Sequence, residues 1–293
     1  MSKVKTIDEA INENTYTLDA GITQSILSCW SCRRKFLLCA NGWHKPDSQD
    51  AKFAFGNCGH ECLEHLYNTK FNGSVTDIID SYFIDDQINK ELMTILIDAY
   101  IEYYSGDMNN EWFNTEEEFD VMYNKYRLRG KIDGVLKVDN KLWLMEHKFF
   151  SRIQEDVLLN SLTFNSQILF YALAAEIIYG QKIEGVIYNI VRKPQYKSIQ
   201  NFTKALDTDT HHFFPRFVIT INDKVMMDYK TMLNEKLSEI DAVLDRFLYP
   251  YINEEFCVGK YTCEYLDACA SRNLIGFVQN DNIFPELTTN NGR

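Results

Sequence analysis

Three side chains in the middle of the chain have the types and spacing needed to hold a metal ion against a phosphate. Asp133 lies in GKIDGV, and Glu146 and Lys148 lie two residues apart in MEHKFF. Two residues at that spacing in a strand point to one face, roughly 7 Å apart. Paired carboxylates suit Mg²⁺, and a lysine beside them can orient water or offset charge on a phosphate. The main-chain carbonyl of His147 is a candidate further ligand.

Two helical segments offer further groups to this constellation. His60 in FGNCGHECLEH is a candidate third metal ligand. Gln167 and Tyr171 are four residues apart shortly after the Glu146 strand, so a helix would place them on one face. The simpler alternative is an exposed strand face with alternating charges, followed by a partly buried tyrosine beside a polar neighbour.

Cysteines near both ends of the chain form a second pattern. Cys257, Cys263 and Cys269 are separated by five-residue gaps, and Cys32 is a fourth candidate far upstream. Structural zinc sites favour gaps of two to four residues, so four thiolates from separated segments are more typical of a [4Fe–4S] cluster. Cys29 and Cys39 are alternatives to Cys32. A zinc-stapled structural protein with an acidic, protein-binding surface is the alternative for the whole chain.

Composition narrows the class of protein. The 293 residues carry a net charge of −12, which argues against a general nucleic-acid coat but leaves room for an enzyme with a local basic groove. No apolar run reaches bilayer length, and the N-terminal MSKVKTIDEA lacks the apolar core of a signal peptide. We therefore expect a cytoplasmic protein with no membrane partner, in which the eight cysteines stay reduced.

Hydrophobic periodicity predicts an α/β or α+β core with a helical N-terminal cover. We expect one domain over 1–293, with a helical insertion at about 74–112 and a mobile tail at about 274–293. A tight Asp139-Asn140 turn should join two of the strands. Helices are predicted at 22–41, 50–69, 74–105, 156–179 and 222–248, and strands at 117–124, 126–138, 141–149, 184–191 and 216–221.

Taken in order, these motifs resemble the PD-(D/E)XK nuclease superfamily, and within it the RecB-like branch with an iron–sulfur clasp. That branch includes the AddB nuclease domain, CRISPR spacer-adaptation nucleases and many phage exonucleases. The likeness covers about 30–270, and six modest motifs in the family's order are together specific. They are Cys32 before a phenylalanine, Gly56-Asn-Cys-Gly-His60, Gly130-Lys-Ile-Asp133-Gly134, Glu146-His-Lys148, Gln167-Ile-Leu-Phe-Tyr171 and the final cysteine triplet.

The resemblance implies a metal-dependent DNA exonuclease with a central mixed sheet flanked by helices and a C-terminal iron–sulfur clasp. Single-stranded DNA ends would be the substrate, and protein partners in DNA repair, phage replication or CRISPR adaptation would be expected. A catalytically silent DNA-end or protein-binding module on the same fold is the alternative. The implied roles are Mg²⁺ or Mn²⁺ ligands for His60, Asp133 and Glu146, the catalytic lysine for Lys148, and positioning of DNA or of that lysine for Gln167 and Tyr171.

The chain departs from the family pattern in three respects. Arg33 follows Cys32 where relatives often have proline, and the cysteine triplet keeps five-residue gaps where several relatives shorten the first. The acidic balance is also unusual for a DNA-processing enzyme and leaves partner docking open.

Overall fold

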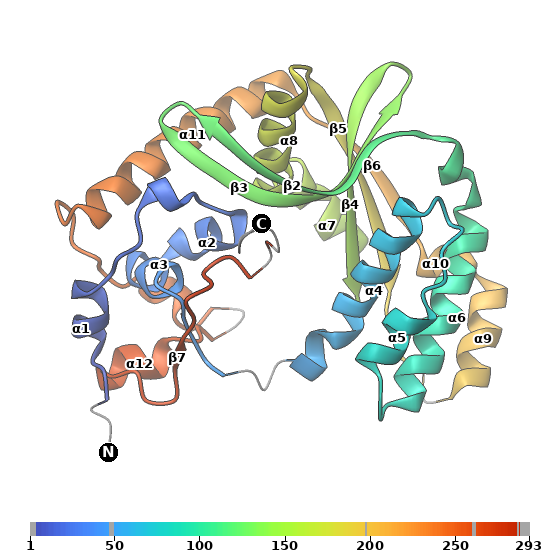
Figure 1. The fold of residues 1–293 in the computed structure, drawn as a ribbon, viewed down its shortest axis with the longest axis horizontal. Helices are drawn as coiled ribbons and strands as arrows, with labels where there is room; N and C mark the ends of the chain where they lie inside the picture. The colour runs from blue at the N-terminus through green and yellow to red at the C-terminus, as the bar shows by residue number, and fades with distance from the viewer. Residues whose placement is uncertain (1–3, 47–49, 197, 260–261, 286, 288–293) are drawn as a thin grey trace. The chain divides into compact units, whose positions relative to one another are not determined.

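The structure, a computed structural model, describes residues 4–46, 50–196, 198–259, 262–285 and 287 (Figure 1). The chain forms two compact units built from separate segments. Unit 1 contains Met1–Asp47, Glu118–Lys131 and Met227–Arg293, and unit 2 contains Ser48–Glu117 and Ile132–Met226. The expectation of one domain over 1–293 stays a prediction beside this division.

A five-stranded mixed sheet has the order β2-β3-β4-β5-β6 and confirms the predicted fold class. β3 and β4 are antiparallel, β4 and β5 parallel, and β5 and β6 antiparallel. Asp139 and Asn140 join β3 to β4 with φ values of 50° and 63°, the left-handed pair that a two-residue hairpin turn needs. The strands are β2 (Glu111–Tyr123), β3 (Tyr126–Val138), β4 (Lys141–Phe150), β5 (Ile183–Arg192) and β6 (Arg216–Thr220).

Helices flank the sheet of unit 2 (Figure 1). α4 packs on β4, and α8 packs on β5. An apolar core joins α4, α5, α6, α9 and α10 to the sheet, with Leu63, Leu96 and Phe202 at 0% exposure. The elements are α4 (Asp50–Asn68), α5 (Thr76–Tyr82), α6 (Gln87–Tyr103), η3 (Ser105–Asn109), α7 (Glu155–Leu162), α8 (Ser166–Tyr179), α9 (Ile199–Thr208) and α10 (Thr210–Phe213).

Two helices predicted as continuous in this unit are divided. The 74–105 segment forms α5 and α6, and the Asp86 side chain caps α6 by accepting from the Asn89 N–H at 3.0 Å. The 156–179 segment forms α7 and α8, and Asn165 caps α8 by accepting from two backbone N–H groups. A side chain that satisfies the first N–H groups starts a new helix, and these aspartate and asparagine caps explain both breaks.

Unit 1 is mainly helical. The predicted 22–41 helix is divided at Cys32, whose φ of −141° and ψ of 120° are extended, so Cys32 lies between two short helices. Its elements are α1 (Ile7–Asn12), η1 (Leu18–Ala20), α2 (Gln24–Ser28), η2 (Cys29–Ser31), α3 (Arg33–Ala40), β1 (Trp43–His44), η4 (Glu254–Phe256), α12 (Leu266–Ser271) and β7 (Val278–Gln279). The long α11 (Asp223–Leu244) begins in unit 2 and continues into unit 1.

The predicted mobile tail at about 274–293 lies partly outside the described residues, at 286 and 288–293. Its first part packs on unit 1: Leu274 and Phe277 are buried in an apolar cluster with Leu38 and Tyr265, and β7 pairs with β1.

Across the described part of the chain, no single helix is long and apolar enough to cross a membrane. The bent pair α7–α8 passes such a test of length and composition only when the two helices are taken together.

Candidate active site

The β3–β4 register brings Asp133 beside Glu146. The β3–β4 ladder begins with the pair Val138–Lys141 at the turn and reaches the pair Gly134–Met145. Asp133 and Glu146 are the next residues along the two strands, so their side chains share one face, opposite to that of Gly134 and Met145. At this point the Asp133 Oδ2 atom accepts the His147 backbone N–H at 2.7 Å. A side-chain carboxylate thus receives an N–H of β4, and this hydrogen bond fixes Asp133 against the strand that carries Glu146.

The buried Glu146 and the half-buried Lys148 form an ion pair on that face. Glu146 is 3% exposed, and burial raises its pKa to about 7, with the Lys148 charge opposing the shift and Asp133 adding to it. For Lys148, burial works to lower the pKa, but the two carboxylates outweigh it, so its pKa is raised. Lys148 is therefore a cation over the whole physiological range, and Glu146 is close to its titration point.

A group of three donors suited to a divalent ion lies beside this pair. One ligand atom from each of His60, Glu116 and Asp133 lies within 4.8 Å of the other two, and all three residues are half-buried. An imidazole nitrogen with two carboxylate oxygens fits Mn²⁺ or Mg²⁺. Of the predicted ligands, this group contains His60 and Asp133. Glu146 is not part of the group, but it lies beside Asp133 on the neighbouring strand.

Sequence reasoning missed Glu116. The residue lies in β2 with a φ of 51°, a left-handed conformation that costs a non-glycine residue free energy and breaks the alternation of the strand. The run Glu116-Glu117-Glu118 was the available indication, because three carboxylates follow one another before the Asp133 strand. Glu117 accepts a hydrogen bond from Tyr179 instead.

Close packing of α4 on β4 places His60. A Cβ at Gly59 would lie 2.2 Å from the Phe149 Cε1 atom, so only glycine allows this approach of helix and strand. The His60 ring then lies 5.2 Å from the Phe149 ring, measured between centroids. Gly59 therefore allows α4 to pack closely enough on β4 for His60 to join the donor group.

The first turns of α8 supply Gln167 and Tyr171. The Gln167 Nε2 atom donates to the Tyr171 hydroxyl at 3.3 Å, as their predicted shared helix face requires. Burial raises the pKa of Tyr171, and the negative charge of Glu146 raises it further. The phenol therefore stays neutral and lies near enough to Glu146 to sense its charge.

The four cysteines predicted as cluster ligands all lie in unit 1. The Cys263 backbone N–H donates to the Cys257 carbonyl at 3.0 Å, which folds the triplet into a turn. Burial raises the pKa of the Cys269 thiol, a hydrogen bond with Arg34 lowers it, and the nearby thiols of Cys32 and Cys257 raise it. The fold thus gathers the upstream cysteine and the downstream triplet.

Cys29 and Cys39 form a separate pair. Their thiols hydrogen-bond to each other, and Cys39 also accepts from the Tyr265 hydroxyl at 3.7 Å. Among the described residues, no three cysteine sulfurs lie within 4.8 Å of one another. Tetrahedral zinc with Zn–S bonds of about 2.3 Å would bring its sulfurs to about 3.8 Å. The described cysteine sulfurs do not have that spacing.

Comparison with known proteins agrees with this arrangement. The family model described as the PD-(D/E)XK nuclease superfamily matches residues 25–270. Among solved structures, a candidate exonuclease from Eubacterium rectale is similar, with a TM-score of 0.54 and 14% identity over 88% of this chain and 97% of that chain. At this identity the likeness concerns the fold alone.

A second solved structure, that of SSO0001, covers 76% of this chain and 96% of its own at 12% identity. Its TM-score of 0.33 is too low to support an argument. Comparison with curated proteins gives no match.

Proposed function

Because the match over residues 25–270 makes the chain a member of the PD-(D/E)XK nuclease superfamily, we propose that it is a metal-dependent DNA exonuclease acting on single-stranded ends. The family and the fold support a nuclease, and DNA is the substrate they imply. The more specific parts of the proposal are the exonuclease activity, the preference for single-stranded ends and the cluster. Its setting would be that of the RecB-like branch, in the cytoplasm with partners in DNA repair, phage replication or CRISPR adaptation.

The observation that carries the proposal is the donor group of His60, Glu116 and Asp133 beside the Glu146–Lys148 ion pair. These residues would hold Mg²⁺ or Mn²⁺, which when bound would polarise the scissile phosphate and lower the pKa of a water molecule. Glu146 and the His147 carbonyl are the predicted additional ligands.

The protonation states of Lys148, Tyr171 and Glu146 limit the roles that these residues can have. Lys148 keeps its proton, so it cannot serve as a general base and would instead donate to the phosphate or orient the attacking water. The neutral Tyr171, hydrogen-bonded to Gln167, would position the DNA or Lys148. Glu146 would become a full carboxylate when a cation replaces its proton.

We assign the [4Fe–4S] cluster to Cys32, Cys257, Cys263 and Cys269, with Cys29 or Cys39 as alternatives to Cys32. The five-residue gaps between Cys257, Cys263 and Cys269 are the feature that supports this cluster over mononuclear zinc. The four thiolates would connect the N-terminal and C-terminal segments of unit 1, which is a structural role.

Labelled DNA tests the nuclease assignment. The protein, purified without oxygen, is incubated with single- and double-stranded DNA labelled at the 5′ or the 3′ end, with Mg²⁺ or Mn²⁺ or with a chelator. We expect metal-dependent release of short products from single-stranded ends, and loss of activity in Lys148→Ala and Glu146→Ala. Cleavage that survives Lys148→Ala would contradict the assigned site, and absence of any cleavage would favour the silent binding module. Iron analysis and a brown colour separate the cluster from zinc.

A further inference from the structure

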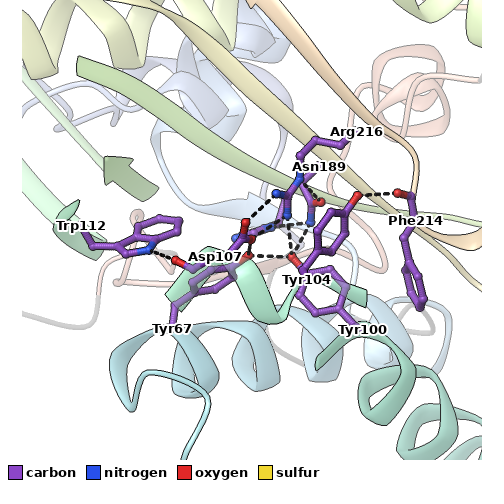
Figure 2. A network of polar contacts seen from close by, with 9 residues as sticks. Tyr67, Tyr100, Tyr104, Asp107, Trp112, Asn189, Phe214 and Arg216 are labelled. Atoms are coloured by element: carbon purple, nitrogen blue, oxygen red, sulfur yellow. Dashed lines mark hydrogen bonds and ion pairs between the residues drawn. The ribbon is translucent and has the colours of Figure 1, made fainter. Parts of the chain in front are cut away.

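A row of polar side chains crosses the sheet on the face opposite Glu146 and Lys148. Figure 2 shows two of them, Asn189 and Arg216, within their network of polar contacts. The register pairs His147 of β4 with Asn189 of β5, and Asn189 with Arg216 of β6. Directly paired residues of neighbouring strands point to the same face, so these three side chains lie side by side. Asn189 is 0% and His147 2% exposed, so their polar atoms depend on partners within the protein.

The orientation of the Asn189 amide is fixed by its neighbours. The Arg216 Nε atom donates to Asn189 Oδ1 at 3.0 Å, and a guanidinium can only donate, so the amide oxygen must face Arg216. The Asn189 Nδ2 atom then faces the other way, with the Tyr100 hydroxyl and His147 Nδ1 each at 2.9 Å. Both amide hydrogens are used, and His147 must accept at Nδ1 and carry its proton on Nε2.

Arg216 is itself held rigidly. Its two Nη atoms donate to the two carboxylate oxygens of Asp107, each at 2.9 Å, and its guanidinium lies 3.5 Å from the centre of the Tyr104 ring. Asp107 also accepts from the Tyr67 hydroxyl at 2.6 Å (Figure 2). Two parallel hydrogen bonds to one carboxylate, supported by further contacts, hold the guanidinium in a single orientation. Arg216 therefore holds the Asn189 amide in place.

His147 connects this network to the candidate active site. Its ring is held by Asn189 at Nδ1 and stacks on Tyr67, with centroids 5.2 Å apart and planes at 26°. Its backbone N–H holds the Asp133 carboxylate at 2.7 Å, and its two chain neighbours are Glu146 and Lys148. One residue thus joins the buried network on one face to three groups of the site on the other.

We propose that Asn189 and Arg216 are positioning residues that set the geometry of the nuclease site through His147. The proposal rests on the proposed function, because it concerns the placement of Asp133, Glu146 and Lys148. Neither residue faces the substrate. They act through His147, because a fixed His147 ring fixes its own backbone. That backbone donates the hydrogen bond that holds Asp133, and it also sets the positions of Glu146 and Lys148 on either side. Displacements well below 1 Å matter at metal sites.

The test compares Asn189→Leu with Tyr104→Phe. Leucine removes the connection between Arg216 and His147. The phenylalanine removes a partly buried hydrogen bond in the same network, from the Tyr104 hydroxyl to the Phe214 carbonyl, but leaves Asn189 and His147 untouched. We expect kcat to fall about tenfold or more in Asn189→Leu, and the half-saturating Mn²⁺ concentration to rise about tenfold, with KM for DNA little changed. Tyr104→Phe should lose stability and keep both values.

Two measurements separate positioning from general destabilisation. In a double variant with His147→Leu, the Asn189→Leu change should cost nothing further, because its effect passes through His147. In Asn189→Asp, the carboxylate still accepts from Arg216 but can only accept from His147, so the ring should move its proton to Nδ1. Long-range ¹H–¹⁵N spectra report that tautomer, and this variant should recover most of the activity because the ring is held again.

The outcomes distinguish this inference from the proposed function. Wild-type protein without nuclease activity would refute the function, and Mn²⁺ affinity would then decide the positioning role alone. Wild-type kcat and Mn²⁺ dependence in Asn189→Leu would overturn the inference, as would equal losses in Asn189→Leu and Tyr104→Phe. If Asn189→Leu does not fold, Arg216→Lys replaces it, because lysine keeps the charge opposite Asp107 and lacks the Nε that fixes the amide. Unchanged kcat and Mn²⁺ dependence in that variant would also overturn the inference.

Discussion

Lowering the pH from about 8 to about 6 should weaken divalent-metal binding about tenfold, because a proton then competes for Glu146. Burial raises the pKa of this carboxyl from 4.5 to about 7. At one pH unit below that value about one site in eleven is ionised, and at one unit above it about ten in eleven are. The ratio of these fractions gives the tenfold change in apparent affinity.

The same shift predicts how the stability of the metal-free protein depends on pH. A carboxyl whose pKa is higher in the folded than in the unfolded state favours folding at low pH, and this contribution is lost as the pH rises from 4.5 through about 7. The difference corresponds to about 3 kcal/mol of the free energy of unfolding. Glu146→Gln should remove this fall in stability.

Mn²⁺ titration followed by electron paramagnetic resonance, at a series of pH values, measures the affinity directly, and urea unfolding measures the stability. Glu146→Gln is the matched control, since the slope that remains in it belongs to the other groups. An affinity that is flat between about pH 6 and pH 8, or a slope unchanged in Glu146→Gln, would refute the reasoning.

Three further changes have defined outcomes. Glu116→Gln removes one of three metal donors, so the half-saturating Mn²⁺ concentration should rise about tenfold, and an unchanged value would exclude Glu116 as a ligand. Cys263→Ser should abolish bound iron and the brown colour and lower the melting temperature of anaerobically purified protein; a variant that keeps its iron would remove Cys263 from the cluster. Gly59→Ala would place a Cβ 2.2 Å from Phe149 and should cost about 1–3 kcal/mol in urea unfolding, and unaltered stability would contradict the close contact of helix and strand.

Patterns of period two and four predicted most of the sheet and the grouping of Asp133, Glu146 and Lys148. The β3 strand covers the predicted residues 126–138, and the Asp139-Asn140 turn has the left-handed backbone that its residue types favour. Alternation in strands is local, so the sequence alone indicates which residues share a face. Val138 is 36% exposed because it lies at the end of the strand beside the turn.

What could not be predicted depends on backbone conformation and on pairing between distant segments. Glu116 lies beside His60 and Asp133 and has a left-handed φ, which a glutamate in the sequence does not indicate. The row of His147, Asn189 and Arg216 exists only once the registers of β4, β5 and β6 are known. In the sequence, Asn189 is an isolated amide within the mainly apolar run Val186-Ile-Tyr-Asn-Ile-Val191.

The order in which the ribosome delivers the segments of unit 1 has a consequence for biogenesis. Cys32 emerges with the first of these segments, and Cys257 with the last, 225 residues later. At about 5–20 residues per second, the Cys32 thiol is synthesised about 10–45 seconds before the other proposed cluster ligands. Unit 2 ends at Met226 and is fully synthesised before that moment. A chain released before Cys257 is synthesised would therefore carry every donor of the candidate metal group but would lack the C-terminal segment of unit 1.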